Sequence, residues 1–536
     1  MKTFRLFSMA ALSLMMAACS SEDNALENAT PAMPGLIPFS ATVAPLSGAT
    51  TRTVYTPGTD GESKPIINVA WKEGDQIFIA RLSPDLGTAG RVTVGKPNDD
   101  GSAPLSGDIS GADGNEIEAY YPASAYDDWG IFTDKYIAQD GTLSGIQDNL
   151  DYRKGTGKIS VIGGKATLAD KLQMKSQIAI WKLTLQNTSG ANLNATKVTI
   201  KDGSNIIAAT KDISATSEVH MAVPFNTSPT TFSDLTIEAT TADGTYTYAA
   251  PSAVNLSHST YYQSTVTMAK LTDLSSISGT EYTVQDGEVL TGTLASNVKI
   301  SIADGATVTL KNVNITNLGD NCNWAGINCP GNATLVLEGT NEVCAGRDES
   351  GNNSYPGIWI ASGKTLTIQG DGTLTAYSNG TNPYGAGIGG GYSISCGNIV
   401  INSGNITATG GQDAAGIGGN TSCGNITING GTITATGGGG GAGIGGGYYA
   451  SCGNIEISGG TVTAKGGSYG AGIGGGNHNG TCGTITITSG VTSVTATKGG
   501  DAPNSIGAGL GGTAITVSIG GVEGAITTSP CTYPEP

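Results

Sequence analysis

The stretch Tyr-Gly-Ala-Gly-Ile-Gly-Gly-Gly-Tyr-Ser-Ile-Ser-Cys-Gly-Asn occupies residues 384–398, and near copies follow at 415–425, 442–454 and 471–484. The isoleucine at the centre of each copy recurs at steps of 29, 27 and 29 residues. Self-similarity at a period of about 20 to 50 residues is typical of a solenoid or array. Between the copies, apolar β-branched residues alternate with polar ones, which predicts strands. The four central residues are Ile388, Ile417, Ile444 and Ile473.

A unit of about 28 residues with three short strands and Gly-rich turns has the length of one coil of a parallel β-helix, whose coils stack about 4.8 Å apart. Stacking aligns equivalent residues, and each fully buried isoleucine contributes roughly 1.5 to 3 kcal/mol. No single coil can bury its own apolar face, so stability comes from the stack. Two interior ladders are predicted: Ile399, Ile426, Ile455 and Ile485, and Ile401, Ile428, Ile457 and Ile487.

The repeat extends beyond its glycines in both directions. Upstream, Ile358 and Ile327 continue the central ladder, and 308–310 is the first, degenerate coil. Downstream, Ala-Gly-Leu-Gly-Gly at 508–512 repeats the phrase after a longer gap, with 491–496 as an insertion. We therefore expect a right-handed parallel β-helix of about eight coils over residues 279–525.

Charge and hydropathy restrict the partners of this 536-residue chain. Its formal net charge is −17, its pI is about 4.5, and 13% of its residues are charged. An acidic chain is poorly suited to nucleic acid or to an anionic membrane surface. After the first 18 residues, no apolar run is long enough to cross a membrane. We expect an extracellular all-β protein with no nucleic-acid partner.

Residues 1–18 have the basic end and the apolar run of a signal peptide. The following Met16-Ala17-Ala18-Cys19 resembles the lipobox of bacterial lipoproteins. That resemblance implies that Cys19 is acylated, with palmitate among its acyl groups, and anchors the chain stably in the outer membrane. The acidic run at 20–23 resembles signals that send lipoproteins of Gram-negative anaerobes to the outer face. The alternative is that 19–34 is only an unstructured tether.

Residues 35–270 contain longer strands separated by Asp-Gly and Pro-Gly turns, which predicts a β-sandwich. Several short motifs occur in the order found in fimbrillin-like (Mfa-type) proteins, and the resemblance implies a two-lobed sandwich of the kind used in pilins, pilus-tip subunits and related surface lipoproteins. These motifs are Thr51-Arg52-Thr53, the run from Trp71 to Ile77, Ala119-Tyr120-Tyr121-Pro122, Leu150-Asp151-Tyr152, the run from Ile178 to Leu183, and Tyr261-Tyr262.

The same resemblance suggests how the N-terminal segment is processed. In pilus-forming relatives an arginine-specific protease removes the N-terminal strand, and Arg52 lies where such a cut would fall. The alternative is an ordinary arginine on a surface loop. After the sandwich we expect a linker at 271–278, the β-helix, and a Pro-containing cap at 526–536. A C-terminal rod would suit the tip of a pilus better than its stalk.

Four cysteines follow the period of the repeat, so stacking would place neighbouring ones about 5 Å apart. A line of thiols does not make a tetrahedral zinc site, and no Cys-x-x-Cys motif occurs, so we expect no metal. We expect a ladder of buried free thiols, with disulfides between adjacent coils as the alternative. The irregular Cys322, Cys329 and Cys344 are better disulfide candidates, and Cys531 is left over. The periodic ones are Cys396, Cys423, Cys452 and Cys482.

Asparagines recur two residues after the cysteines, at Asn398, Asn425 and Asn454. An asparagine stacked at a turn can accept hydrogen bonds from backbone amides. We expect a structural role for them.

The rod contains few residues that could catalyse the cleavage of a polysaccharide. Polysaccharide lyases and hydrolases need clustered carboxylates, or carboxylates with calcium and a basic residue. We expect no catalytic residue and no enzyme. The acidic residues after 350 are few and scattered: Asp371, Asp413, Glu456, Asp501, Glu523 and Glu535.

Aromatic residues flank the Gly phrase, and stacking would align their loops along the rod. Exposed rings beside polar residues can stack on sugar faces. The alternative is that they only cover turn glycines. The repeat also resembles β-helical carbohydrate-binding domains, some of which bind calcium; only Asp371 and Asp413 would serve such a calcium ion, and no other cofactor is expected. The candidate ligand-binding residues are Tyr384, Tyr392, Tyr448, Tyr449, Tyr469 and His478.

The sequence thus predicts a surface-exposed lipoprotein adhesin whose β-helix binds a glycan or host-surface ligand. One alternative is a structural pilus tip subunit or spacer that contacts other pilus subunits and binds no glycan. The other is a polysaccharide-degrading enzyme.

Overall fold

The computed structural model describes most of the chain after residue 35. Its residues are 36–46, 56–59, 65–68, 70–83, 86–124, 134–224, 229–295, 297–319, 321–347, 354–378, 383–478, 480–513 and 516–534. The signal peptide, Cys19, the tether and Arg52 lie outside them, so what the sequence predicts there stays a prediction. Within this part of the chain, no helix is long and apolar enough to span a membrane.

The described residues form two compact units, the first from those within 1–46, 71–127 and 153–174 and the second from those within 47–70, 128–152 and 175–536. In the first unit, β9 pairs with both β1 and β8, so the sheet closes on itself around a core that includes Trp71 and Ile77. In spatial order its strands are β8 (Arg153–Ile162), β7 (Glu116–Tyr121), β4 (Gln76–Arg81), β5 (Gly87–Val94), β6 (Ala103–Ser110), β1 (Leu36–Val43) and β9 (Lys165–Leu168).

The second unit begins with a lobe in which β11 lies between β14 and β19, while β12, β16 and β17 lead back to β19. Trp181 and Ile237 belong to its apolar core. Its main strands are β11 (Ile178–Asn187), β12 (Lys197–Asp202), β13 (Asn205–Ala209), β14 (Glu218–Pro224), β16 (Leu235–Thr241), β17 (Gly244–Ala249) and β19 (Tyr261–Asp273). Shorter elements of the unit are β2 (Thr56–Thr59), β3 (Pro65–Asn68), η1 (Lys135–Ile137), α3 (Leu143–Asn149), β10 (Lys175–Ser176), β15 (Thr230–Phe232) and β18 (Val254–Leu256).

Strand β19 belongs to the lobe and also starts the β-helix. Its first half pairs in parallel with β11, and its last residues pair in parallel with β21 (Val289–Thr293), with Leu271 opposite Val289. The expected linker therefore begins inside a strand, and its next residues form η2 (Leu274–Ser276). Buried Glu288 accepts hydrogen bonds from Thr272 Oγ1 (3.1 Å) and Tyr282 OH (2.9 Å) at this junction. The sheet of the lobe is continuous with that of the rod.

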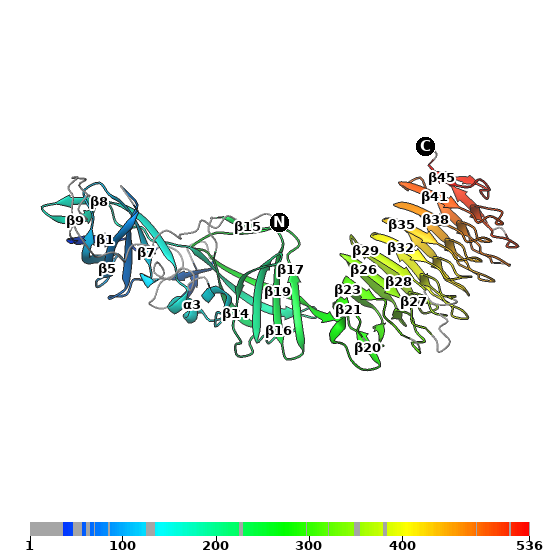
Figure 1. Ribbon diagram of the computed structural model, residues 1–536, viewed down its shortest axis with the longest axis horizontal. Coiled ribbons are helices and arrows are strands. Elements are labelled where there is room, and N and C mark those ends of the chain that lie inside the picture. The colour runs from blue at the N-terminus through cyan, green and yellow to red at the C-terminus, as the bar shows by residue number, and fades with distance from the viewer. Residues whose placement is uncertain are drawn as a thin grey trace, which may run out of the picture. The chain divides into compact units, whose positions relative to one another are not determined.

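The rest of the chain is a parallel β-helix with three strands per coil, and the predicted all-β fold is confirmed (Figure 1). The first row of stacked strands is β20 (Glu281–Val284), β22 (Lys299–Ile302), β24 (Ile327–Cys329), β27 (Ile358–Ile360), β30 (Ile388–Gly389), β33 (Ile417–Gly418), β36 (Ile444–Gly445), β39 (Ile473–Gly474) and β42 (Ile506–Gly507). The second row is β21, β23 (Ala306–Ile315), β25 (Ala333–Glu338), β28 (Thr365–Gly370), β31 (Asn398–Ile401), β34 (Ile426–Ile428), β37 (Ile455–Ile457), β40 (Ile485–Ile487) and β43 (Val517–Ile519). The third row is β26 (Thr340–Cys344), β29 (Thr373–Tyr377), β32 (Asn405–Thr409), β35 (Thr432–Thr436), β38 (Thr461–Lys465) and β41 (Ser493–Thr497).

Both predicted isoleucine ladders lie inside the rod in the expected register. Ile426 is paired with Ile399 on one side and Ile455 on the other, and Ile428 is placed in the same way between Ile401 and Ile457. All members of the two ladders are at most 2% exposed. The prediction is confirmed, because a parallel in-register stack places equivalent residues of successive coils next to one another.

The downstream end differs from the expectation. Ile506, not Leu510, pairs with Ile473, and Leu510 is 40% exposed. Residues 493–497 are no insertion, since they form β41 and pair with β38. The glycine-rich sequence around Leu510 resembles the earlier copies, but the apolar side chain of Leu510 does not point into the core. The rod has about seven turns, close to the eight coils that the sequence predicts.

The parallel stack ends in antiparallel pairs. Strand β44 (Val522–Glu523) folds back on β43, and β45 (Cys531–Tyr533) pairs with β41. These strands cover part of the last coil.

The glycine that follows each central isoleucine is required by the closeness of the coils. Gly418 has φ +134°, and a Cβ there would lie 1.9 Å from the carbonyl oxygen of Gly445. Only glycine fits such an approach.

Candidate functional site

The loops before and after the Gly-Ile-Gly strands gather on one surface of the rod. We call the surface formed by 383–395, 410–422, 437–451 and 466–478 the loop face. Each loop after the strand is bonded to the loop before the strand of the preceding coil: Tyr448 N donates to Asp413 O (2.8 Å), and Asn477 N donates to Gly440 O (2.8 Å). The main chain of the loop face is therefore braced between coils.

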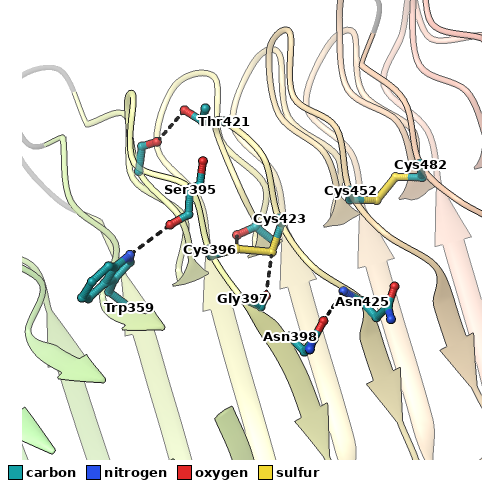
Figure 2. The surroundings of a disulfide bond; sticks show 12 residues. Trp359, Ser395, Cys396, Gly397, Asn398, Thr421, Cys423, Asn425, Cys452 and Cys482 are labelled. Atoms are coloured by element: carbon teal, nitrogen blue, oxygen red, sulfur yellow. Dashed lines mark hydrogen bonds between the residues drawn. A yellow bond between two sulfur atoms is a disulfide. The ribbon is translucent and has the colours of Figure 1, made fainter. Parts of the chain in front are cut away.

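Two disulfides fasten the loops that follow these strands, Cys396–Cys423 and Cys452–Cys482 (Figure 2). Each joins adjacent coils, with Cα atoms 4.5 Å apart. The expected ladder of free thiols is wrong. Parallel stacking places neighbouring cysteines at the short end of the Cα range that a disulfide accepts. Because each sulfur can form one such bond, the row divides into two pairs.

The three irregular cysteines that the sequence marks as disulfide candidates, Cys322, Cys329 and Cys344, are all buried. Cys329 was a disulfide candidate, but it is a free thiol within the rod core, and burial raises its pKa to about 12. Such a thiol is protonated at neutral pH and behaves as a small apolar group. Cys322 and Cys344 are also buried in the core.

Trp359 anchors the start of the disulfide-linked region. It lies on β27, and its indole Nε1 donates to the carbonyl oxygen of Ser395 (3.1 Å), the residue before Cys396 (Figure 2). The sequence did not single out this residue, because the partner is a backbone atom in the next coil.

The asparagine ladder has the structural role that was predicted. Asn398 Oδ1 accepts from Asn425 N, and Asn425 Oδ1 accepts from Asn454 N, both at 2.9 Å (Figure 2 shows the first). Asn454 Oδ1 continues the series by accepting from Thr484 N (2.9 Å). Each side chain bonds a backbone amide of the following coil, so these asparagines hold the turns in register.

Five of the six candidate ligand-binding residues come together in two ring groups on the loop face. Tyr384 and Tyr392 form one, with ring centroids 5.7 Å apart. The other joins two consecutive coils: the ring of Tyr448 lies 4.5 Å from that of Tyr449 and 4.9 Å from that of His478. The rings of Tyr449 and His478 are stacked at 5.3 Å. Tyr392 and Tyr449 are 57% and 62% exposed, so large ring surfaces face solvent.

Tyr469 differs from these five. It is 39% exposed, and its carbonyl oxygen accepts a hydrogen bond from Leu510 N (2.9 Å). Among the described ring contacts it joins neither group.

Backbone conformation sets the direction of the ring-bearing loops. Ser393, Tyr449 and His478 occupy the same place in three loops and have φ of 57°, 54° and 50°. Non-glycine residues in this region cost of order 1 kcal/mol and cluster at functional sites. Two of the three carry rings of the second group.

A carboxylate borders the second ring group. A Cβ placed on Gly440 would lie 2.7 Å from Asp413 Oδ1 and 3.4 Å from Tyr448 Cδ2, so the carboxylate and the ring share one small space that glycine leaves open. Partial burial raises the pKa of Asp413 above its ordinary value of 3.8, although the Gly440 amide favours the ionised form. The sequence named Asp413 only as a possible calcium ligand.

The two residues suggested as calcium ligands, Asp371 and Asp413, lie in different turns of the rod. Asp371 lies in the turn between β28 and β29, whereas Asp413 lies in the loop between β32 and β33. Within the described ranges, no group of three or more His, Cys, Asp or Glu side chains could hold a metal ion.

Comparison with known proteins found one matching family model and several similar solved structures. A family model described as "Beta helix repeat" matches residues 366–392, 399–421, 426–448 and 455–477. No curated protein matches the sequence. Similar solved structures, which cover the N-terminal half, are fimbrial and cell adhesion proteins of Bacteroides and related genera, in line with the fimbrillin-like resemblance.

Three of these structures illustrate the range. A fimbrial protein from Bacteroides ovatus has 13% identity and a TM-score of 0.24, with 44% of this chain and 49% of that chain covered. A candidate cell adhesion protein from the same species has 15% identity and a TM-score of 0.26, with 44% and 95% covered. The tip fimbrial protein Mfa3 from Porphyromonas gingivalis, with C-terminal truncation, has 8% identity and a TM-score of 0.23, with 43% and 95% covered. Because the TM-scores are low, we base no functional argument on them.

Proposed function

We propose that this protein is a surface adhesin that binds glycan through the loop face of its β-helix. The observation that carries the proposal is the cluster of Tyr448, Tyr449 and His478, three rings from two coils within 5.3 Å of one another. Exposed rings offer flat apolar surface to the CH groups of a pyranose, and a few placed polar groups then fix its orientation.

Asp413 supplies a suitable polar group. Its carboxylate lies beside the Tyr448 ring and can accept hydrogen bonds from sugar hydroxyls. Gly440, which lies between them, carries no side chain that would cover the carboxylate.

Rigidity of the loop face also supports binding. The two disulfides and the main-chain bonds between coils hold the rings before a ligand arrives. A pre-organised site loses less conformational entropy on binding. Disulfides also persist mainly in oxidising compartments, which fits an exported protein.

The sequence predictions at the N-terminus complete the proposal. Cys19 would carry the lipid anchor in the outer membrane, with the protein facing outward, and the partner would be a glycan or another host-surface ligand. Joining other pilus subunits, with processing at Arg52, belongs to the alternative of a structural tip subunit or spacer.

Binding of the full-length mature chain to a panel of plant, mucin and microbial polysaccharides tests the proposal. The panel is run with calcium and with chelator, beside a Tyr448→Ala/Tyr449→Ala variant and the control Val522→Ala, which removes a 73% exposed apolar side chain at the end of the rod. The proposal predicts retention by at least one polymer, lost in the double variant and kept in the control. Absence of binding to every polymer would favour the structural role, and release of shortened saccharides would favour an enzyme.

A further inference from the structure

The two ring groups lie at a defined interval along the rod. Tyr384 and Tyr392 flank β30, and Tyr448 and Tyr449 follow β36. The coil between them, built on β33, has Thr421 and Ser422 at the corresponding place and no ring. Ring groups therefore occur two coils apart, which is about 9.6 Å at the strand spacing of a parallel stack.

The interval is fixed by bonds between successive loops. Thr421 Oγ1 donates to Gly391 O (3.1 Å), and Cys423 N donates to Ser451 O (2.8 Å). In the following coil, Tyr449 N donates to Asn477 O (3.1 Å). The loops thus rise one coil at a time together with the strands, and the rings cannot drift apart along the rod.

The charge of the loop face limits the class of glycan that it can bind. The loop face contains no lysine or arginine, and Asp413 is its one carboxylate. Polyuronates and sulfated glycans carry dense negative charge and need cationic partners. A neutral polymer meets no such requirement, and its hydroxyls suit a carboxylate acceptor.

We propose that the ligand is a neutral, extended β-1,4-linked polysaccharide whose chain runs along the rod axis and stacks with every second sugar on the two ring groups, on Tyr392 in the first and on the equivalent Tyr448 and its neighbour Tyr449 in the second. The disaccharide unit of such a chain has nearly the length of two coils, so sugars separated by one residue reach the two ring groups together. This inference rests on the proposed glycan binding and adds the class and direction of the ligand.

The test measures affinity of the full-length mature chain for soluble β-1,4-linked glucan, mannan and xylan oligosaccharides of two to six sugars. Bent α-linked glucans and polygalacturonate serve as comparison ligands. Simultaneous contact with two sites raises affinity without any new kind of contact. We expect affinity for at least one β-1,4-linked series to rise by about tenfold or more once the oligosaccharide has enough sugars to reach both groups.

The variant Tyr392→Ala separates the two levels of the proposal. It should remove the gain with length, so that the affinity of the variant for a hexasaccharide falls to about its affinity for a disaccharide, while Val522→Ala should keep the full gain. Equal affinity for short and long saccharides, or preference for α-linked or anionic polymers, would overturn the inference and leave glycan binding intact. Absence of binding to every saccharide, short or long, would instead overturn the proposed function itself.

Discussion

Cys396 and Cys423 lie 27 residues apart in the sequence, yet a disulfide joins them across neighbouring coils, with 4.5 Å between their Cα atoms. Cys452 and Cys482 repeat the arrangement two coils further on. Both bonds lie at the base of the loops that carry the rings, so the stability of the stack and the position of the candidate site depend on the same covalent links.

Removal of one disulfide should therefore destabilise the rod. For loops of this length the loss of unfolded-state constraint corresponds to about 3 to 4 kcal/mol. The variant Cys396→Ser/Cys423→Ser should unfold at lower temperature and lower denaturant concentration than the parent chain. Ser395→Ala is a matched control, because Trp359 bonds only the backbone oxygen of that residue. An unchanged midpoint, or recovery of both cysteines as free thiols in the folded chain, would contradict the pairing.

The glycine after each central isoleucine should tolerate no side chain. Gly418→Ala places a Cβ 1.9 Å from a carbonyl oxygen at a φ of +134°, so we expect a loss of about 3 kcal/mol or more. Gly500→Ala is the control, since nothing lies within 4 Å of a Cβ there. Chemical denaturation of both variants distinguishes close packing from a general effect of replacing glycine. Similar midpoints for the two would show that the coils can move apart.

The asparagine ladder should contribute a smaller amount per residue. Asn425→Ala leaves Asn454 N without its acceptor, and because the turn is exposed we expect a loss of about 1 kcal/mol. Asn425→Asp keeps an acceptor oxygen and should retain most of the stability, as Asp304 does where its Oδ1 accepts from Asn332 N (2.7 Å). Equal destabilisation by alanine and aspartate would argue that the amide donors, not the acceptors, matter.

Binding of glycan should weaken as the pH falls through the pKa of Asp413. That pKa lies above 3.8 because of partial burial, so the carboxylate is lost as an acceptor at a higher pH than for an exposed aspartate. A raised pKa also means that protonation of this group favours the folded state, so it cannot cause acid unfolding. Affinity measured against pH should show the transition in the parent chain and a flat profile in Asp413→Asn. The same transition in the variant would show that Asp413 takes no part in glycan binding.

Filling the space between the carboxylate and the ring provides a second test of the site. Gly440→Ala has no unfavourable φ, and its Cβ meets the flexible side chain of Asp413 and the Tyr448 ring. We expect weaker glycan binding with a nearly unchanged unfolding midpoint. Unchanged affinity would place the sugar elsewhere on the loop face.

The isoleucine ladders and the asparagines could be predicted from sequence because a parallel stack converts period into contact. The same reasoning failed for the cysteines, since period shows that Cys396 and Cys423 are neighbours but not whether they bond. At the downstream end, the glycine phrase around Leu510 was more conspicuous than Ile506, although core packing selects the latter.

The candidate site was predictable only in part. Periodicity indicated that Tyr448 and Tyr449 lie near His478, because they occupy matching loops of adjacent coils. It could not show that Asp413 borders Tyr448, since this contact joins a loop before one strand to a loop after the next. The role of β19 in starting the β-helix could not be predicted for a similar reason. Its last residues pair with β21 after a turn, and this pairing depends on the lobe that precedes the rod.

Footprinting of tyrosines in the full-length mature chain locates the glycan-binding surface without any substitution. Side-chain oxidation is followed by mass spectrometry with and without a polysaccharide that the chain retains. Binding on the loop face should protect Tyr392, Tyr448 and Tyr449 and leave the reactivity of Tyr533 in the terminal strand β45 unchanged. Protection confined to other tyrosines, with the loop face as reactive as before, would contradict it.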